Sequence, residues 1–184
     1  MSALDAEDVD IFPLVSRAAE QRGIPIVGLL AMLKAESGLR RTAERWGDRS
    51  RDAVEHIGDV DYLRGLLADL RRRGIGLDVS FGYSQLIVST AGGYGIGDGS
   101  MSVDNVLAVR EALFDRTMSI DVGARHLSGC YSQADGYDEQ DLQALLAYNS
   151  GSPQPQGNWY WQRWAGNIAS YEAALQWARE LLAV

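Results

Sequence analysis

Apolar residues recur at helical spacing along almost the whole chain. In residues 7–22, Ile11, Val15 and Ala18 lie at i, i+4 and i+7, which is the spacing of one face of an amphipathic helix. Residues 25–36 form a second and more strongly apolar segment. The same periodicity predicts further helices over 59–73, 103–114, 118–133, 139–149 and about 166–182.

Alternation typical of strands is confined to short stretches. We expect a turn near residues 41–46 and a small element of two or three strands inside 74–88 or 92–100. Residues 49–78 are charged and contain four glycines, so we expect them to form an inserted helical segment with loops. The pattern therefore predicts one mainly α domain over residues 1–184, with at most a small β element.

Composition narrows the class of protein. The 184 residues are 46% apolar and carry a net charge of −8, which argues against a general nucleic-acid binder because such a protein needs a basic face. No apolar run approaches the roughly 20 residues of a membrane-spanning helix, and the acidic N-terminal segment lacks the pattern of a secretory signal. The single cysteine, Cys130, excludes an intramolecular disulfide, and we expect its side chain to be buried rather than nucleophilic.

The most informative residue is an acidic one at the end of the second apolar segment. Leu29, Leu33 and Glu36 lie at i, i+4 and i+7, so they share one face of the predicted helix. Loss of water on this face and the negative end of the helix dipole would both raise the pKa of the carboxyl group. Glu36 could then act as a general acid, although this helix alone fits a partly buried glutamate satisfied by neighbouring donors.

Four short segments resemble the motifs of one enzyme family. Glu-Ser-Gly at 36–38 resembles the catalytic Glu-Ser motif of soluble lytic transglycosylases and goose-type lysozymes. Phe-Gly-Tyr-Ser-Gln-Leu at 81–86 is similar to their Gly-Leu-Met-Gln-Ile motif, and Ala-Tyr-Asn-Ser-Gly at 147–151 to their Ala-Tyr-Asn-Ala-Gly motif. The helix with Ile168 and Tyr171 resembles their last motif, an aromatic residue that reaches the catalytic acid. The order and approximate spacing agree over most of the chain, about residues 10–175.

The chain departs from the family pattern inside the second of these motifs. Ser84 stands where the family has methionine, and Tyr83 stands where it has leucine, whereas Gly82 and Gln85 match. These departures concern the substrate groove. The long segment at 49–78, between the first two motifs, is a further difference, and it could form a lid, a groove wall or a partner surface.

The resemblance implies a lysozyme-like domain that cleaves peptidoglycan between N-acetylmuramic acid and N-acetylglucosamine. In a lytic transglycosylase, one glutamate protonates the glycosidic oxygen and then takes a proton from the 6-hydroxyl of the sugar, which closes a 1,6-anhydro ring without water. Carried over by motif, Glu36 is the catalytic residue and Tyr171 donates the hydrogen bond that orients it. The residues that would bind the substrate are Ser37, Gly82, Tyr83, Gln85, Tyr148, Asn149 and Tyr171.

Two other functions remain open on the same resemblance. A hydrolytic lysozyme of the goose type would need a second carboxylate to activate water, and the candidates are Asp48, within Trp-Gly-Asp-Arg at 46–49, and Asp78. The goose-type pattern has an aspartate soon after the second motif, but residues 87–89 here are Ile, Val and Ser, which favours the transglycosylase. The third function is that of an inactive glycan-binding or virion structural domain on the same fold.

The remaining features add expectations about partners. His56 and His126 show no metal-ligand spacing, and the glycine-rich segment 92–99 lacks the context of a phosphate-binding loop, so we expect no metal and no cofactor. The expected partner is the glycan strand of peptidoglycan, with no nucleic acid and no membrane insertion. The site of action would be the bacterial cell wall, in the periplasm or outside the cell, for a phage lysin, a virion-associated enzyme or a bacterial protein. The sequence does not indicate an oligomeric state.

One aromatic cluster allows two interpretations. Its members are Trp159, Tyr160, Trp161 and Trp164, which follow a turn region rich in proline and glycine. Packing in the core is the simpler interpretation, and stacking against sugar rings is the alternative.

Overall fold

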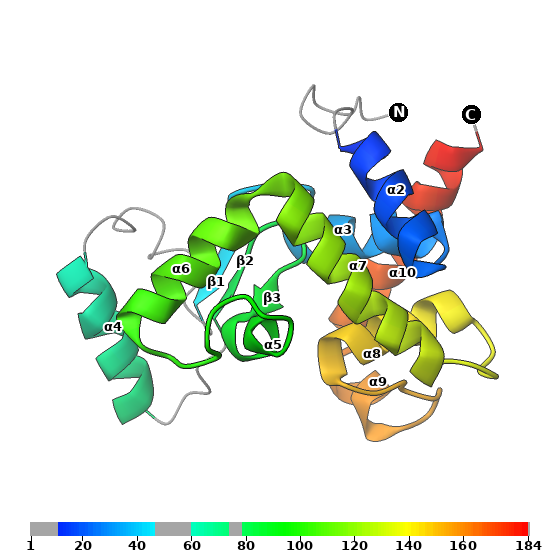
Figure 1. Cartoon of the computed structure of the whole chain (residues 1–184). Coiled ribbons are helices and arrows are strands. Elements are labelled where there is room, and N and C mark those ends of the chain that lie inside the picture. The colour runs from blue at the N-terminus through cyan, green and yellow to red at the C-terminus, as the bar shows by residue number, and fades with distance from the viewer. Residues whose placement is uncertain (1–10, 47–59, 74–78, 184) are drawn as a thin grey trace. The chain divides into compact units, whose positions relative to one another are not determined.

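A computed structural model describes residues 11–46, 60–73 and 79–183 of the chain (Figure 1). The described residues are mainly helical with one three-stranded sheet, which confirms the fold class predicted from the sequence. They form two compact units. The first, the helical unit, contains the residues up to Leu39 and from Gly123 onward, and the second, the sheet unit, contains Arg40–Val122.

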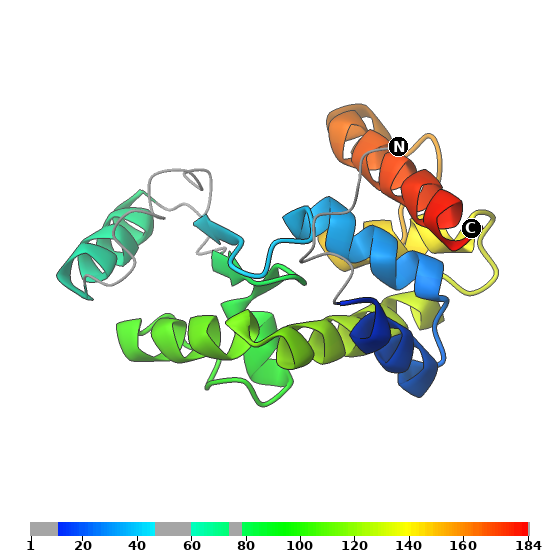
Figure 2. The same cartoon turned by 90° about the horizontal axis from the view of Figure 1, so that it is seen from above.

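The helical unit is built around one apolar helix. Helix α3 (Ile26–Ser37) contacts α2 (Phe12–Arg22), α8 (Gln140–Ser150) and α10 (Ala165–Leu182), as Figures 1 and 2 illustrate. Its buried residues run through more than one face, because neighbouring helices cover it on several sides. The remaining elements of this unit are α9 (Trp159–Arg163) and the C-terminal part of α7 (Arg116–Gln133).

A glycine lets another side chain approach α3 closely. A Cβ atom at Gly28 would lie 1.9 Å from the hydroxyl oxygen of Tyr131, a residue of α7. That hydroxyl donates to Oδ1 of Asp141 at 2.8 Å, and Arg179 donates to Oδ2 of the same carboxylate at 3.1 Å. Residues of α7, α8 and α10 are thereby linked by one polar network beside α3.

The sheet unit contains three short antiparallel strands in the order β1-β2-β3. These are β1 (Glu44–Trp46), β2 (Val79–Phe81) and β3 (Leu86–Ile87), with Glu44 paired to Phe81 and Phe81 paired to Leu86. Two of the strands lie inside 74–88, as predicted. The expectation of a turn over 41–46 is wrong for residues 44–46, because their pairing with β2 depends on residues more than 30 positions away.

Helices make up the rest of the sheet unit: α4 (Val60–Arg72), α5 (Val88–Gly93), α6 (Val103–Phe114) and the N-terminal part of α7. Helix α6 contacts β2, α5 contacts β3, and α4 contacts α6. The ring of Phe114 meets Phe81 edge to face at 6.2 Å, and the guanidinium of Arg110 lies 4.5 Å from the centre of the Phe114 ring. Arg110 also donates to Glu44 at 2.7 Å, and the Glu44 side chain is 1% exposed. This buried ion pair joins α6 to β1, and losing one partner of such a pair typically costs about 3–5 kcal/mol.

Most helices occur where the periodicity predicted them, and the inserted segment does contain the helix expected at 59–73. The short helices α5 and α9 were not predicted. The glycine-rich segment expected as a flexible loop begins inside α5, and the side chain of Asn105 fixes its far end by accepting from the Asp98 amide at 2.9 Å. Within the described ranges, no helix is both long and apolar enough to cross a bilayer.

Candidate active site

The candidate acid lies in the last turn of α3. Gly38, with φ of +63°, ends this helix, and its amide donates to the carbonyl oxygens of Leu33 and Lys34. Glu36 is half-buried, and the hydroxyl of Tyr171 donates a hydrogen bond to its Oε1. The structure thus contains the hydrogen bond between Tyr171 and Glu36 that the family resemblance implied. Because Tyr171 belongs to α10 and is buried, the contact fixes the direction of the carboxyl group.

Tyr171 is suited to remain a hydrogen-bond donor. Burial raises the pKa of its hydroxyl well above the usual value, and the nearby negative charge of Glu36 raises it further. The hydroxyls of Tyr148 and Tyr160 add to the same effect. Four side chains from α3, α8, α9 and α10 therefore share one electrostatic environment, which we call the Glu36 cluster: Glu36, Tyr148, Tyr160 and Tyr171.

The third motif places an amide beside this cluster. Asn149, at the exposed end of α8, accepts a hydrogen bond at its Oδ1 from the Tyr160 hydroxyl at 2.8 Å. The Nδ2 of Asn167, on α10, donates to the same oxygen at 3.4 Å. With its carbonyl oxygen held in this way, the Asn149 side chain presents its NH2 group outward as a donor. Gly151, with φ of +83°, then ends the helix, as its place in the motif suggests.

Tyr148 is held from its other side by a histidine. The rings of Tyr148 and His126 meet edge to face, with 4.8 Å between their centroids. Burial lowers the pKa of His126, which favours its neutral form at neutral pH. Among the described residues, no group of three or more His, Cys, Asp or Glu side chains could hold a metal ion.

Two members of this arrangement were not predicted as site residues. Tyr160 was placed in an aromatic cluster interpreted as core packing or, alternatively, as sugar stacking, and Asn167 was not singled out at all. Burial raises the pKa of the Tyr160 hydroxyl, with a smaller contribution from the charge of Glu36 and an opposing hydrogen bond from Asn167. The sequence signal that could have found them is their position after the third motif, on the segment that leads into the helix of Tyr171.

The side chain of Ser37 is directed into the helix. It is buried, and its hydroxyl donates to the carbonyl oxygen of Leu33 at 2.9 Å. This bond within α3 satisfies a polar group at the helix end. Its neighbour Glu36 is the motif residue that is partly exposed, and substrate binding by Ser37 stays a prediction.

The second motif belongs to the sheet unit and forms the turn between β2 and β3. Gly82 has φ of +73°, and a Cβ atom there would lie 2.0 Å from the carbonyl oxygen of Leu113 and 2.7 Å from Oγ of Ser119. Gly82 was among the residues expected to bind the substrate. In the structure it is required because the backbone of α6 and the side chain of Ser119 occupy that space.

Gln85 and Tyr83 are also turned inward. The Nε2 of Gln85 donates to the carbonyl oxygens of Ala43, at 2.9 Å, and Gly82, at 3.0 Å, while its Oε1 accepts from Ser80 at 3.0 Å. Tyr83 is 1% exposed, and Ser84 meets the hydroxyl of Ser119. Tyr83 is therefore a core residue, and the side-chain amide of Gln85 bonds to the turn. Their binding of substrate stays a prediction.

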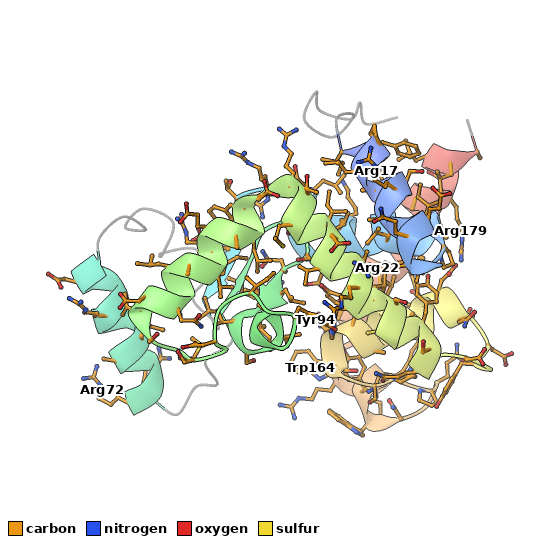
Figure 3. The ribbon with its side chains drawn as sticks, viewed as in Figure 1. Arg17, Arg22, Arg72, Tyr94, Trp164 and Arg179 are labelled. Atoms are coloured by element: carbon orange, nitrogen blue, oxygen red, sulfur yellow. The ribbon has the colours of Figure 1, made fainter. Side chains whose placement is uncertain are left out.

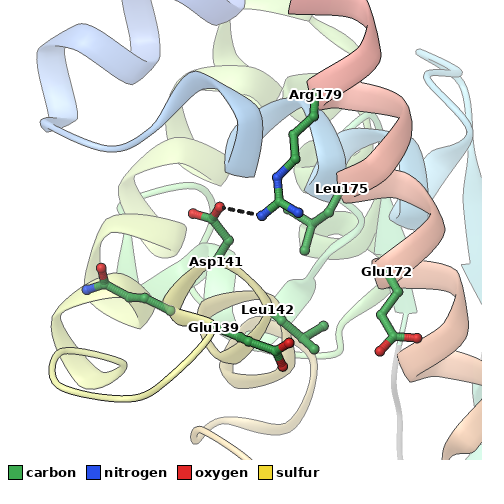
Figure 4. A pocket seen from close by; sticks show the side chains of 7 residues that line it. Glu139, Asp141, Leu142, Glu172, Leu175 and Arg179 are labelled. Atoms are coloured by element: carbon green, nitrogen blue, oxygen red, sulfur yellow. Dashed lines mark hydrogen bonds and ion pairs between the residues drawn. The ribbon is translucent and has the colours of Figure 1, made fainter.

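The other candidate groups lie outside the described residues or have a packing role. Asp48, Asp78 and His56 lie outside the residues that the structure describes. Cys130 is buried, and burial raises the pKa of its thiol to about 12, so it is a packing residue as expected. A shallow pocket between α8 and α10 is lined by carboxylates together with Arg179 (Figure 4), but Glu36 is not among its lining residues. Two of the charged residues that line the pocket, Asp141 and Arg179, form an ion pair with each other.

One comparison with known proteins identifies a family. Residues 13–171 match the family described as "Transglycosylase SLT domain". The match includes every residue of the Glu36 cluster and the whole sheet unit. Neither the curated proteins nor the solved structures contain a significant match.

Proposed function

Because the chain belongs to the SLT transglycosylase family, whose members are peptidoglycan lytic transglycosylases, we propose that it cleaves the β-1,4 bond between N-acetylmuramic acid and N-acetylglucosamine and leaves 1,6-anhydro-muramic ends. The enzyme acts on the cell wall, as its family does. The observation that supports this cleavage reaction is the hydrogen bond from buried Tyr171 to Glu36.

Glu36 supplies both proton transfers in this proposal. Its protonated carboxyl group gives a proton to the glycosidic oxygen, and the bond between that oxygen and C1 of the muramic sugar breaks. The positive charge that develops at C1 is stabilised by the N-acetyl group of the same sugar. The carboxylate of Glu36 then takes the proton of the 6-hydroxyl, whose oxygen bonds to C1. The acid is restored and no water is consumed, so a second carboxylate is not needed.

The neighbours of Glu36 position the reacting groups. Tyr171 holds one carboxyl oxygen, so the acid points in a fixed direction throughout both steps. Asn149, whose carbonyl oxygen is occupied by Tyr160, offers its NH2 group to an acceptor on the substrate. The carbonyl of an N-acetyl group is the acceptor that this donor suits best. Tyr148, half-buried against His126, adds an aromatic surface beside it.

The residues of the second motif take a supporting role. Gly82 and Gln85 hold the β2–β3 turn in shape, and any contact of this turn with the glycan would come from its backbone. The segment after this turn also favours a transglycosylase. Val88 and Ala91 are buried in α5, and residues 87–89 carry no carboxylate to activate water.

The direct test digests purified peptidoglycan in water enriched in oxygen-18 and weighs the soluble muropeptides by mass spectrometry. A transglycosylase gives anhydro-muramic ends that carry no label, because the new bond at C1 comes from the sugar's own oxygen. We expect this product from the wild-type enzyme.

Muropeptides with newly formed reducing muramic ends in place of anhydro ends would contradict the proposal, since their formation consumes water. Such a result would identify a hydrolase and direct attention to Asp48 and Asp78 as the water-activating groups. The absence of any product from several types of peptidoglycan would contradict both enzymatic mechanisms and favour an inactive glycan-binding domain.

A further inference from the structure

Two tryptophans stand exposed at the ends of the short helix α9. Trp159 is 65% exposed and Trp164 is 42% exposed, and Figure 3 shows Trp164 near the start of α10. Exposed apolar residues that lie together, rather than scattered singly, are typical of a binding site. The third tryptophan of this segment, Trp161, differs because its Nε1 donates to the carbonyl oxygen of Gln154 at 2.5 Å. We call Trp159 and Trp164 the tryptophan pair.

The helix that carries the tryptophan pair is firmly held. Oδ1 of Asn158 accepts from the amides of Tyr160 and Trp161, at 2.9 and 3.3 Å, and so caps the first turn. The Nδ2 of Asn158 in turn donates to Gln154 at 2.7 Å. Because its backbone is anchored in this way, α9 presents the two exposed rings in a defined arrangement, which lowers the entropic cost of binding a ligand.

Tyr160 connects the tryptophan pair to the candidate acid. Its ring meets that of Trp159 at 70° with 6.0 Å between centroids, and that of Trp164 at 37° with 6.3 Å between centroids. The hydroxyl of the same Tyr160 donates to Asn149, and its pKa responds to the charge of Glu36. The buried side chain of Tyr160 therefore contacts both exposed tryptophan rings and Asn149, a residue of the proposed active site.

The exposed area of the tryptophan pair indicates the size of the ligand that it can bind. An aromatic side chain buries about 150–250 Å² in total, so this pair at its observed exposure offers roughly 250 Å². A stable protein interface needs about 800 Å² from each partner, which is several times more. One or two sugar rings match the smaller area, and the CH-bearing faces of a pyranose pack well on a flat aromatic ring. The guanidinium of Arg163, 5.7 Å from the Trp164 ring centre, adds a cation beside this surface that could meet a carboxylate of the peptide stem.

We propose that Trp159 and Trp164 form an additional binding site for a hexosamine ring of the peptidoglycan glycan strand, next to the rings that are cleaved. This site rests on the proposed function, because its ligand is another part of the same substrate. It binds the strand and takes no part in proton transfer, so it should contribute mainly to affinity and to the length of glycan that is preferred.

The test measures binding to insoluble peptidoglycan by sedimentation in the inactive background Glu36→Gln. Addition of Trp159→Ala and Trp164→Ala together should weaken the dissociation constant about tenfold or more, as truncation of anchoring tryptophans usually does. Trp159→Phe, which keeps a flat ring, should retain most of the binding, whereas Trp159→Leu, which keeps only apolar bulk, should not. The matched control is Tyr137→Ala, which removes an aromatic side chain that is 41% exposed in the loop between α7 and α8, and which should leave binding unchanged.

The outcomes separate this site from the proposed function. If the Glu36→Gln parent binds and the double tryptophan variant binds equally well, the additional site is refuted and the proposed function stands. If the parent itself does not bind peptidoglycan, both proposals fail together. A change of the double variant from oligomer to monomer in gel filtration, with binding unchanged, would also overturn the proposal and assign the pair to contacts between copies of the chain.

Discussion

The end of α3 and the β2–β3 turn both carry family motifs, yet their side chains are used in opposite ways. At the end of α3, Glu36 is partly exposed, and its carboxyl group accepts a hydrogen bond from the hydroxyl of Tyr171 on α10. At the turn, backbone and side-chain atoms fill the space beside Gly82, the Tyr83 side chain is buried in the core, and the Gln85 amide donates to a backbone carbonyl. A motif residue can therefore mark chemistry or architecture, and the hydrogen-bond partners of its side chain distinguish the two.

The largest effect on the turn should come from Gly82→Ala. The new Cβ atom would lie 2.0 Å from a backbone oxygen that cannot move without shifting α6, so we expect the free energy of unfolding to fall by more than about 3 kcal/mol. The control is Gly95→Ala, where φ is +81° but no atom lies within 4 Å, and where backbone strain alone costs about 1–2 kcal/mol. Equal losses for the two variants in urea denaturation would show that the close contact is unimportant.

Gln85→Leu should damage stability while sparing the chemistry. The change removes three hydrogen bonds and leaves the Ala43 carbonyl without this donor, which should cost about 2–3 kcal/mol. Turnover by the folded fraction should stay near the wild-type value, because the side-chain amide of Gln85 is bonded within the protein. A large fall in turnover with unchanged stability would restore Gln85 to a direct role on the glycan.

Tyr171→Phe should give the reverse result. Loss of one hydroxyl from a buried hydrogen bond should change stability by about 1 kcal/mol. Turnover should fall about tenfold or more, because the acid is no longer oriented, while KM changes little. Assays of kcat and KM beside thermal denaturation would check this, and a fall confined to stability would reduce Tyr171 to a packing residue.

The smallest effect concerns the dependence of stability on pH. Burial lowers the pKa of His126, so the unfolded chain binds a proton more readily than the folded chain does. The resulting stability is present above the ordinary histidine pKa of about 6.5 and is lost as the pH falls through the lower, folded value. His126→Phe, which keeps a ring against Tyr148, should flatten this part of the profile of unfolding free energy against pH. An unchanged profile would show that another group is responsible.

The sequence predicted local structure better than it predicted roles. Helix α6 was predicted with the bounds it has, because apolar periodicity and the Ser102 cap are local signals. Strand β1 was missed because its pairing partner is distant, and α9 was missed because five residues are too few to show a period. Glu36, Tyr148, Asn149 and Tyr171 were correctly expected in one neighbourhood. The side chains of Tyr83 and Gln85 point into the protein, and Tyr160 donates to Asn149. These arrangements depend on tertiary packing, which the spacing of residues along the sequence does not encode.

The most direct test of Glu36 as the catalytic acid compares wild type with Glu36→Gln in three measurements on one preparation: muropeptide release, binding to peptidoglycan, and thermal stability. The amide has nearly the same shape and can still accept from Tyr171, but it cannot give and take a proton. We expect release to fall by about 100-fold or more, with binding and stability near wild type. Release that stays within a few-fold of wild type would contradict the assignment of Glu36.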